Sequence, residues 1–203
     1  MAEDAKEAIG SMGDDTPLAV LSDRYRPLYH FFRQNFSQVT NPPIDSLREN
    51  KVMSLKTRFG NLGNILDFTN LTEENIYVLD SPILSNSQLE KFTNFFGEKS
   101  ITIDCTFDKS ENLETSIERI RKECEIAVRQ GLTQLILSDK NISEKRLPIP
   151  MLLSVGAINT YLIKKKLRGY ASINAQTGEA LDTHSFATLI GVGATTVNPY
   201  LAL

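Results

Sequence analysis

The stretch Leu132-Thr-Gln-Leu-Ile-Leu-Ser-Asp139, "LTQLILSD", is a nearly unbroken apolar run that ends on two polar residues. A strand that faces water on one side alternates apolar and polar residues, whereas a strand covered on both faces need not. The run therefore predicts a buried strand inside a parallel sheet.

Strand and helix patterns alternate on both sides of this stretch. Further strands are predicted at "IYVLD" (76–80), "SITIDCTF" (100–107), "GYASINAQ" (169–176) and "ATTVN" (194–198). Helices are predicted at 85–96, 111–130, 150–167 and 182–191. Repeated strand–helix units imply an α/β fold with a parallel sheet or part of a βα barrel.

The helix from Glu111 to Gln130 has the clearest pattern in the chain. Asp108 and Glu111 have the spacing of a capping box, and Gly131 ends the helix. Its expected buried stripe is Leu113, Ile117, Ile120, Cys124 and Val128, and its expected ion pairs are Glu118–Lys122, Arg119–Glu123 and Arg121–Glu125. The preceding helix is expected to be capped by Ser85 or Ser87.

Residues 1–75 differ from the rest in having helix signals and no clear strand. A cap at Asp15-Thr16-Pro17 opens one helix, and Asp45–Glu49 is predicted to begin another short helix, followed by a loop at 58–66. One aromatic helical face of expected core residues is formed by Tyr25, Tyr29, Phe32, Phe36 and Val39. We therefore divide the chain into a helical arm (1–75) and a βα-repeat part (76–203), within one structural domain that is part of something larger.

The sequence "QVTNPPID" (38–45) within the arm holds two adjacent prolines. Proline fixes its own φ angle and pushes the preceding residue toward extended conformations. The segment is therefore predicted to be a stiff spacer that holds its backbone groups in place.

The composition excludes several classes of function. The 203 residues carry a net charge of −3, which gives no electrostatic reason to expect a nucleic acid as a partner. No apolar run is long enough to cross a bilayer, and the acidic opening is not a secretory signal, so the cytoplasm is expected. Two isolated cysteines form neither a disulfide framework nor a CxxC metal site.

The residue types and spacings indicate no active site. Asp14 and Asp15 make a poor metal chelate, and "GVGA" (191–194) follows a helix where a phosphate-binding turn needs a strand. His30 and His184 stand in none of the motif contexts that nucleophilic catalysis uses. Cys105 has no basic neighbour, and Cys124 is a core position. We expect no catalytic, cofactor-binding or metal-binding residue, although the loops after the strands, at 80–85, 106–112, 138–150 and 174–182, are where βα folds carry function.

Several of these stretches, read together, resemble the central domain of glutamate synthase. The matching residues are "GSMGDDTPLAVLS" (10–22), "RPLYHFFRQNFSQVTNPPIDSLRE" (26–49), "VMSL" (52–55), "LILSD" (135–139) and "HSFATLIGVGATTVNPYLA" (184–202). Two departures stand out: Asn159-Thr160 replaces a frequent His-His, and Lys140 replaces a more usual arginine.

The resemblance implies a passive role within a larger enzyme. Such enzymes make glutamate from glutamine and 2-oxoglutarate, and the central domain, similar to a degenerate TIM-type barrel, joins a glutaminase domain to a synthase domain that holds FMN and an iron–sulfur cluster. This fragment is then expected to be inactive alone and to hold no cofactor. By resemblance, Thr40, Asn41, Pro42 and Pro43 line the ammonia tunnel or form a joint between domains.

Two other functions compete with this interpretation. The chain can be a stand-alone βα domain that binds a phosphate or flavin at its strand ends. It can also be an interaction module that docks through the aromatic arm.

Overall fold

The computed structural model describes residues 26–32, 47–59 and 76–202. The chain forms two compact units, residues 1–54 and 55–203. The first unit contains the 3-10 helix η1 (Leu28–Phe31) and the short helix α1 (Glu49–Val52). Most of the predicted aromatic helical face lies outside the described residues. A short helix is present where Asp45–Glu49 was predicted to begin one, and among the described residues it starts at Glu49.

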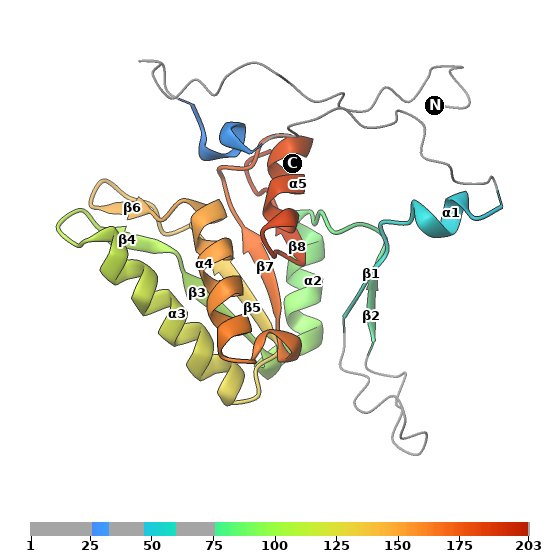
Figure 1. Cartoon of the computed structure of the whole chain (residues 1–203), viewed down its shortest axis with the longest axis horizontal. Coiled ribbons are helices and arrows are strands. Elements are labelled where there is room, and N and C mark those ends of the chain that lie inside the picture. Colours follow the sequence, from blue (N-terminus) through green and yellow to red (C-terminus); the bar gives the residue numbers. More distant parts are fainter. Residues whose placement is uncertain (1–25, 33–46, 60–75, 203) are drawn as a thin grey trace. The chain divides into compact units, whose positions relative to one another are not determined.

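The second unit is built on a parallel four-stranded sheet (Figure 1). Its strands are β3 (Ser100–Asp104), β5 (Gln134–Ser138), β7 (Ser172–Gln176) and β8 (Thr196–Asn198), in the order β3-β5-β7-β8. All five residues of β5 are buried, and parallel strands flank it on both sides. This confirms the prediction drawn from "LTQLILSD".

The two faces of this sheet differ in polarity. Side chains alternate along a strand, and paired residues share a face. One face therefore carries two apolar rows, Ile103, Leu137, Ala175 and Val197 in one and Ile101, Leu135 and Ile173 in the other. The other face carries Ser100, Thr102, Asp104, Gln134, Ile136, Ser138, Ser172, Asn174, Gln176, Thr196 and Asn198. One face is therefore apolar, and the other is almost wholly polar.

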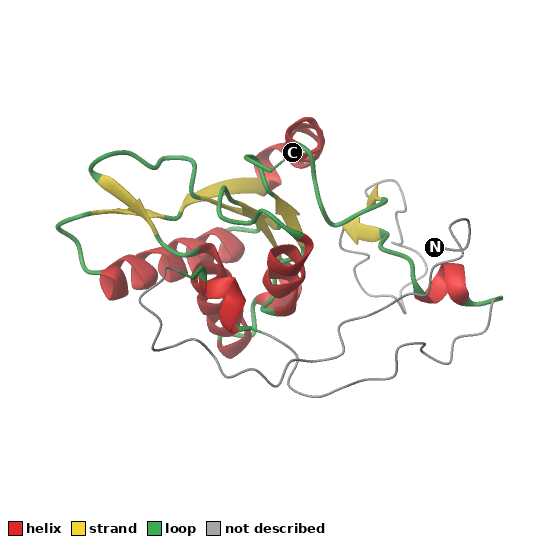
Figure 2. Ribbon diagram, turned by 90° about the horizontal axis from the view of Figure 1, so that it is seen from above, coloured by secondary structure: helices red, strands yellow, loops and turns green. Residues whose placement is uncertain are grey.

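Helices cover both faces of the sheet, as the view along its edge shows (Figure 2). Helices α3 (Leu113–Arg129), α4 (Met151–Lys164) and α5 (Thr183–Gly191) contact successive strands. Helix α2 (Asn86–Phe96) lies on the polar face, where the Asn86 side chain accepts a hydrogen bond from Asn198. The reason is the direction of the connection across the sheet. Ile83 pairs with Val197 beside β8, so α2 leads from that edge back to β3 at the other edge, whereas α3, α4 and α5 connect strands in the reverse direction. Because such connections are right-handed, α2 must lie on the face opposite to the other three helices.

The helix caps follow the sequence only in part. Ser85 forms a capping box with Gln88, which confirms one of the two predicted caps of α2. The capping box predicted at Asp108 and Glu111 is wrong: Asp108 ends a strand, and Asn112 caps α3 by accepting from the Glu114 amide at 2.8 Å. Gly131 follows α3 with a φ of +91°, a conformation that favours glycine.

The core stripe and the ion pairs of α3 also differ in detail from the prediction. The buried residues are Ser116, Ile120, Cys124, Ala127 and Val128. The Arg119–Glu123 ion pair is confirmed at 3.1 Å. Arg121 pairs with Glu118 instead of Glu125, because the carboxylate of Glu125 is engaged by Arg129 and Tyr161.

Two small antiparallel pairs complete the unit, with the 3-10 helices η3 (Gly97–Lys99) and η4 (Arg168–Tyr170). Strand β1 (Thr57–Phe59) pairs with β2 (Tyr77–Leu79), and β4 (Thr106–Asp108) pairs with β6 (Arg146–Pro148). The expectation of no strand before residue 75, with a loop over 58–66, is therefore wrong at β1, whose three residues are too short a run to show a period. The predicted strand 100–107 is interrupted at Cys105, where the pairing partner changes from β5 to β6.

The α/β class with parallel βα repeats is confirmed, and the described residues form an open sheet rather than a closed barrel. The predicted division after residue 75 stays a prediction.

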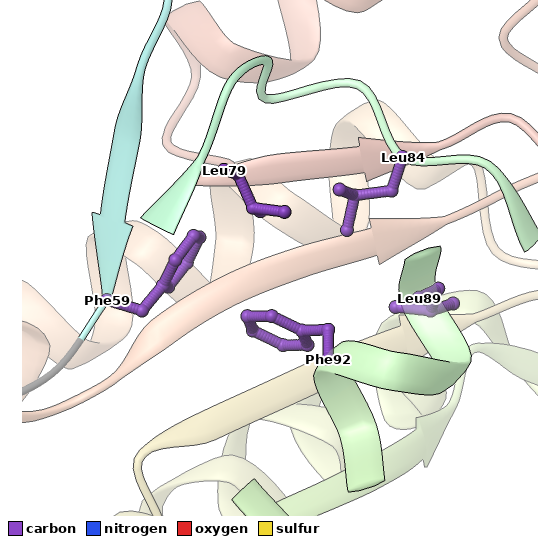
Figure 3. Packing of buried hydrophobic residues seen from close by; sticks show 5 residues of the cluster. All are labelled: Phe59, Leu79, Leu84, Leu89 and Phe92. Atoms are coloured by element: carbon purple, nitrogen blue, oxygen red, sulfur yellow. The ribbon is translucent and has the colours of Figure 1, made fainter. Parts of the chain in front are cut away.

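A hydrophobic cluster joins α2 to the β1–β2 pair. Its buried members are Phe59, Leu79, Leu84, Leu89 and Phe92 (Figure 3). The rings of Phe59 and Phe92 meet edge to face, with centroids 4.9 Å apart. This cluster is what holds the β1–β2 pair in place, because two short strands alone are marginal in water.

Replacing Phe92 with alanine is expected to lower the free energy of unfolding by about 3–5 kcal/mol, because its fully buried ring leaves a cavity. Phe95→Ala is the matched control: it removes the same ring from the same helix at a side chain that is 47% exposed, and should cost about 1 kcal/mol. Urea denaturation of the chain measures both values. Equal losses would contradict the assignment of Phe92 to the core.

Candidate functional site

The carboxyl ends of the four parallel strands meet at one edge, where α/β proteins place their functional groups. The last residues of the strands lie in register: Asp104, Ser138, Gln176 and Asn198. Ser138 Oγ donates to Gln176 Oε1 at 2.8 Å, and Gln176 Nε2 donates to Asn198 Oδ1 at 3.2 Å. Asn198 Nδ2 donates onward to the Leu84 carbonyl at 2.9 Å. One row of side chains thus links three strands to the start of α2.

Asp139 lies directly after β5 and is completely buried. Its carboxyl group accepts hydrogen bonds from Thr177 Oγ1 at 2.6 Å, from the Gly178 amide at 3.2 Å and from the Tyr200 hydroxyl at 2.8 Å. Burial, followed by the hydrogen bond to Asp139, raises the pKa of Tyr200 well above its usual range. Asp139 therefore ties the loop after β7 and the turn after β8 to the end of β5.

The same edge is closed further by two other charged groups. The Lys140 ammonium lies 5.1 Å from the centroid of the Tyr200 ring. Glu179 Oε2 accepts a hydrogen bond from the Met151 amide at 3.0 Å. Helix α4 begins after Pro150 and has no side-chain cap from its own first turn, so Glu179 supplies one from the neighbouring loop.

At the outer strand, Asp104 holds the β4–β6 pair. Asp104 Oδ2 is 2.9 Å from Arg146 Nη2 and 3.2 Å from Asn141 Nδ2, and Thr106 Oγ1 donates to Oδ1 at 2.7 Å. Burial acts to raise the pKa of Asp104, but the hydrogen bonds from Thr106 and Asn141 and the charge of Arg146 outweigh it and lower the pKa. Two of the loops expected to carry function, 106–112 and 138–150, are thus paired with each other.

The carboxyl edge is filled by its own side chains. Each polar group named above has its partner within the fold, and Gly178 lies so close to Tyr200 and Leu201 that an added Cβ would lie 2.8 Å from Leu201 Cδ1. A binding site needs donors or acceptors that are free to meet a ligand. The named groups at this edge instead bond to one another, from Ser138 to Asn198 and from Asp139 to Tyr200.

The residues singled out from the sequence are dispersed. Thr40, Asn41, Pro42 and Pro43, with Asp14 and Asp15, lie outside the described residues. His30 and His184 are exposed on η1 and α5. The described part of the chain contains no group of three or more His, Cys, Asp or Glu side chains placed to hold a metal. Within that same part, no helix combines the length and the apolar character needed to span a membrane.

The "GVGA" turn connects α5 to β8, as its sequence context indicated. Gly193 has a φ of +126°, and its carbonyl accepts a hydrogen bond from Arg168 Nη2 at 2.9 Å. A Cβ at Gly193 would lie 2.3 Å from Asn159 Cγ. The glycine therefore serves close packing against α4.

Asp139, Glu179 and Tyr200 were not recognised in the sequence as a cluster. One feature of the sequence indicates such a cluster, namely an aspartate directly after a strand that is apolar along its length. A buried acidic group at that position needs hydrogen-bond donors from neighbouring loops. Which loops supply them depends on strand order.

Both cysteines are buried, and burial raises their pKa values, that of the Cys105 thiol to about 12. The negative charges of Asp104 and Asp139 act on Cys105 in the same direction. Neither thiol is therefore expected to react with an aromatic disulfide reagent in the folded chain near about pH 8. The smaller thiolate fraction alone slows Cys105 by on the order of a thousandfold. Absorbance of the released thiolate, followed before and after addition of urea, measures this, and rapid labelling of the folded chain would contradict it.

Tyr200→Phe is expected to lower the free energy of unfolding by about 1–3 kcal/mol, because Asp139 then lacks one donor. Tyr170→Phe, at a side chain 63% exposed, is the matched control and should cost less than about 0.5 kcal/mol. Because folding raises the pKa of Tyr200, its stabilisation is complete below the unfolded value of about 10 and is lost as pH rises above it. Denaturation of both variants at neutral and alkaline pH tests this, and a pH-independent difference would contradict it.

Comparison with known proteins assigns the chain to a family along its whole length. The family model described as the glutamate synthase central domain matches residues 1–203. The NADPH glutamate synthase large chain of Azospirillum brasilense is 57% identical over 100% of this chain and 14% of its own length. That of Bacillus subtilis is 45% identical over 98% of this chain and 13% of its length.

A third relative has a different named electron donor. The chloroplastic ferredoxin-dependent glutamate synthase of Spinacia oleracea is 43% identical over 100% of this chain and 13% of its length. The chain thus spans about a seventh of the relatives that it matches along its whole length, and it belongs to the glutamate synthase central domain family.

Proposed function

We propose that this chain is the connecting section of a glutamate synthase large chain. It joins a glutaminase domain to a synthase domain that binds FMN and an iron–sulfur cluster, in an enzyme that converts glutamine, 2-oxoglutarate and reductant into two glutamates. The cytoplasm remains its predicted location.

The observation that carries this proposal is the filled carboxyl edge of the sheet. Asp139, Tyr200 and the row from Ser138 to Asn198 use their hydrogen-bonding groups on one another. An independent ligand-binding βα domain needs such groups free, so this edge favours a connecting section over the stand-alone alternative.

The names of the relatives support the same proposal. The three relatives compared above are named for NADPH or for ferredoxin as electron donor, and their sequence identity to this chain lies between 43% and 57%. A section that contacted the electron donor would be expected to differ between these enzymes. The connecting section therefore serves a step that the enzymes share, which is the transfer of ammonia between the two centres.

Thr40, Asn41, Pro42 and Pro43 line the ammonia tunnel in this proposal, by resemblance. An ammonia conduit needs fixed walls, since a mobile wall admits water and allows ammonium to form. Two prolines restrict the unfolded backbone and so lower the entropic cost of ordering the segment.

Replacing Pro42 and Pro43 together by alanine in the full-length enzyme is expected to uncouple its two reactions. The change removes roughly 1–2 kcal/mol of conformational restriction, a factor of about 5 to 30 in the population of the ordered segment. Glutamate formed per glutamine hydrolysed should fall several-fold, with free ammonia released, while synthesis from added ammonia is retained.

The matched control is Pro148→Ala in the short strand β6, which should leave the ratio unchanged. Glutamate and ammonia are measured from the same reaction. A ratio that stays at the wild-type value in the double variant would remove residues 40–43 from the tunnel wall.

A further inference from the structure

The amino-terminal edge of the sheet is open where the carboxyl edge is filled. A cavity of about 640 Å³ lies there, between the end of α2 and the starts of β5, β7 and β8. Among its lining residues are Phe95, Phe96, Lys99, Gln134, Arg168 and Tyr170. No carboxylate belongs to the described residues that line it.

Arg168 is a cation without a counter-charge in the described part of the chain. Its guanidinium donates to Asn159 Oδ1 at 2.8 Å, to the Gly193 carbonyl at 2.9 Å and to the Ala171 carbonyl. All three acceptors are neutral, and these bonds use three of the five N–H groups of an arginine. Burial lowers the pKa of Arg168, and no carboxylate acts on it. A desolvated positive charge of this kind gains free energy when an anion reaches it.

Lys99 adds a second positive charge at the same cavity. Its side chain is exposed at the end of η3, and its ammonium has no ion pair with any described residue. Lys99 and Arg168 are therefore two cations on one cavity wall, and no acid among the described residues pairs with either. A carboxylate supplied from outside the described chain is complementary to this pair.

Apolar surface continues from the cavity along the same edge. Phe95 and Tyr170 are large side chains left partly exposed at the cavity. A second depression of about 580 Å³ shares Thr133 and Tyr170 with the first and is lined by Leu132 and Leu167. We call these two joined depressions the amino-edge groove. An elongated groove with both apolar and cationic walls fits a length of polypeptide rather than a compact small molecule.

We propose that the amino-edge groove receives an acidic segment of the longer polypeptide, with a carboxylate at Lys99 and Arg168 and an apolar neighbour against Phe95 and Tyr170. This inference rests on the proposed function, since it takes the partner from the same large chain. The matched region is only 13–14% of the length of these relatives, which leaves ample sequence to supply the segment.

Zero-length carbodiimide coupling of the full-length enzyme tests the proposal. The reagent joins an ammonium to a carboxylate only when the two are in contact. Peptide mass spectrometry is expected to find Lys99 joined to an aspartate or glutamate outside residues 1–203. Lys99→Gln should abolish this product, while Lys122, an exposed lysine on α3, should not form a cross-link to the same segment.

Hydrogen exchange in the full-length enzyme provides a second measurement. Lys99→Glu should raise exchange in peptides covering 131–134 and 168–171 by about tenfold relative to wild type, whereas Lys122→Glu should not. Tyr170→Ser removes the apolar contact without changing charge and should act in the same direction.

Three outcomes would overturn the proposal. The first is that Lys99 forms no cross-link while other lysines of the enzyme react, and the second is that its partner lies within residues 1–203. The third is that added inorganic phosphate protects groove peptides that exchange freely in the wild-type enzyme, which would identify a free anion as the ligand. The proposed function is judged separately by the ratio of glutamate to glutamine, so each idea can fail without the other.

Discussion

The buried polar face of the parallel sheet is the constraint on which the rest of the structure depends. Amide and hydroxyl groups inside a protein cost free energy unless each finds a hydrogen-bond partner. Asn174 meets this requirement by donating to Gln134 Oε1 at 3.2 Å and accepting from Thr196 Oγ1 at 2.7 Å. Such bonds form in one strand register only, because a slip of one residue would turn the polar side chains toward the apolar face.

Helix α2 follows from the same constraint. In a βα barrel every helix lies outside and the inner face lines the barrel, whereas here α2 covers the polar face itself. Phe92 and its cluster exclude water from one part of that face, and Asn86 completes the row that begins at Ser138. The sheet stays open because a helix occupies the side on which a barrel would close.

The two edges of the sheet therefore have opposite characters. At the carboxyl edge, Asp139 binds the loop after β7 and the turn after β8, so the chain leaves the sheet along a fixed path. At the amino edge, Arg168 and Lys99 bring positive charge to a cavity that no described acid neutralises. The proposed connecting role would use both features, a rigid interior and an outer surface that a neighbouring part of the polypeptide can contact.

The sequence by itself determined the α/β class, four strands of the parallel sheet, the approximate helices and the family. These properties follow from local periodicity and from long motifs, both of which are contained within single segments of the chain. The predicted strand at 76–80 instead forms β2, which pairs antiparallel with β1 outside that sheet. Only the tertiary structure decided strand β1, the β4–β6 pair and the cap of α3 at Asn112. A strand of three residues is too short to show an alternating pattern, and the sequence offers more than one capping residue before α3. The tertiary structure also decided the cluster around Asp139 and the desolvated charge of Arg168. Residues up to 61 positions apart, such as Asp139 and Tyr200, become neighbours only through strand order. Hydrogen bonding and desolvation act between such spatial neighbours.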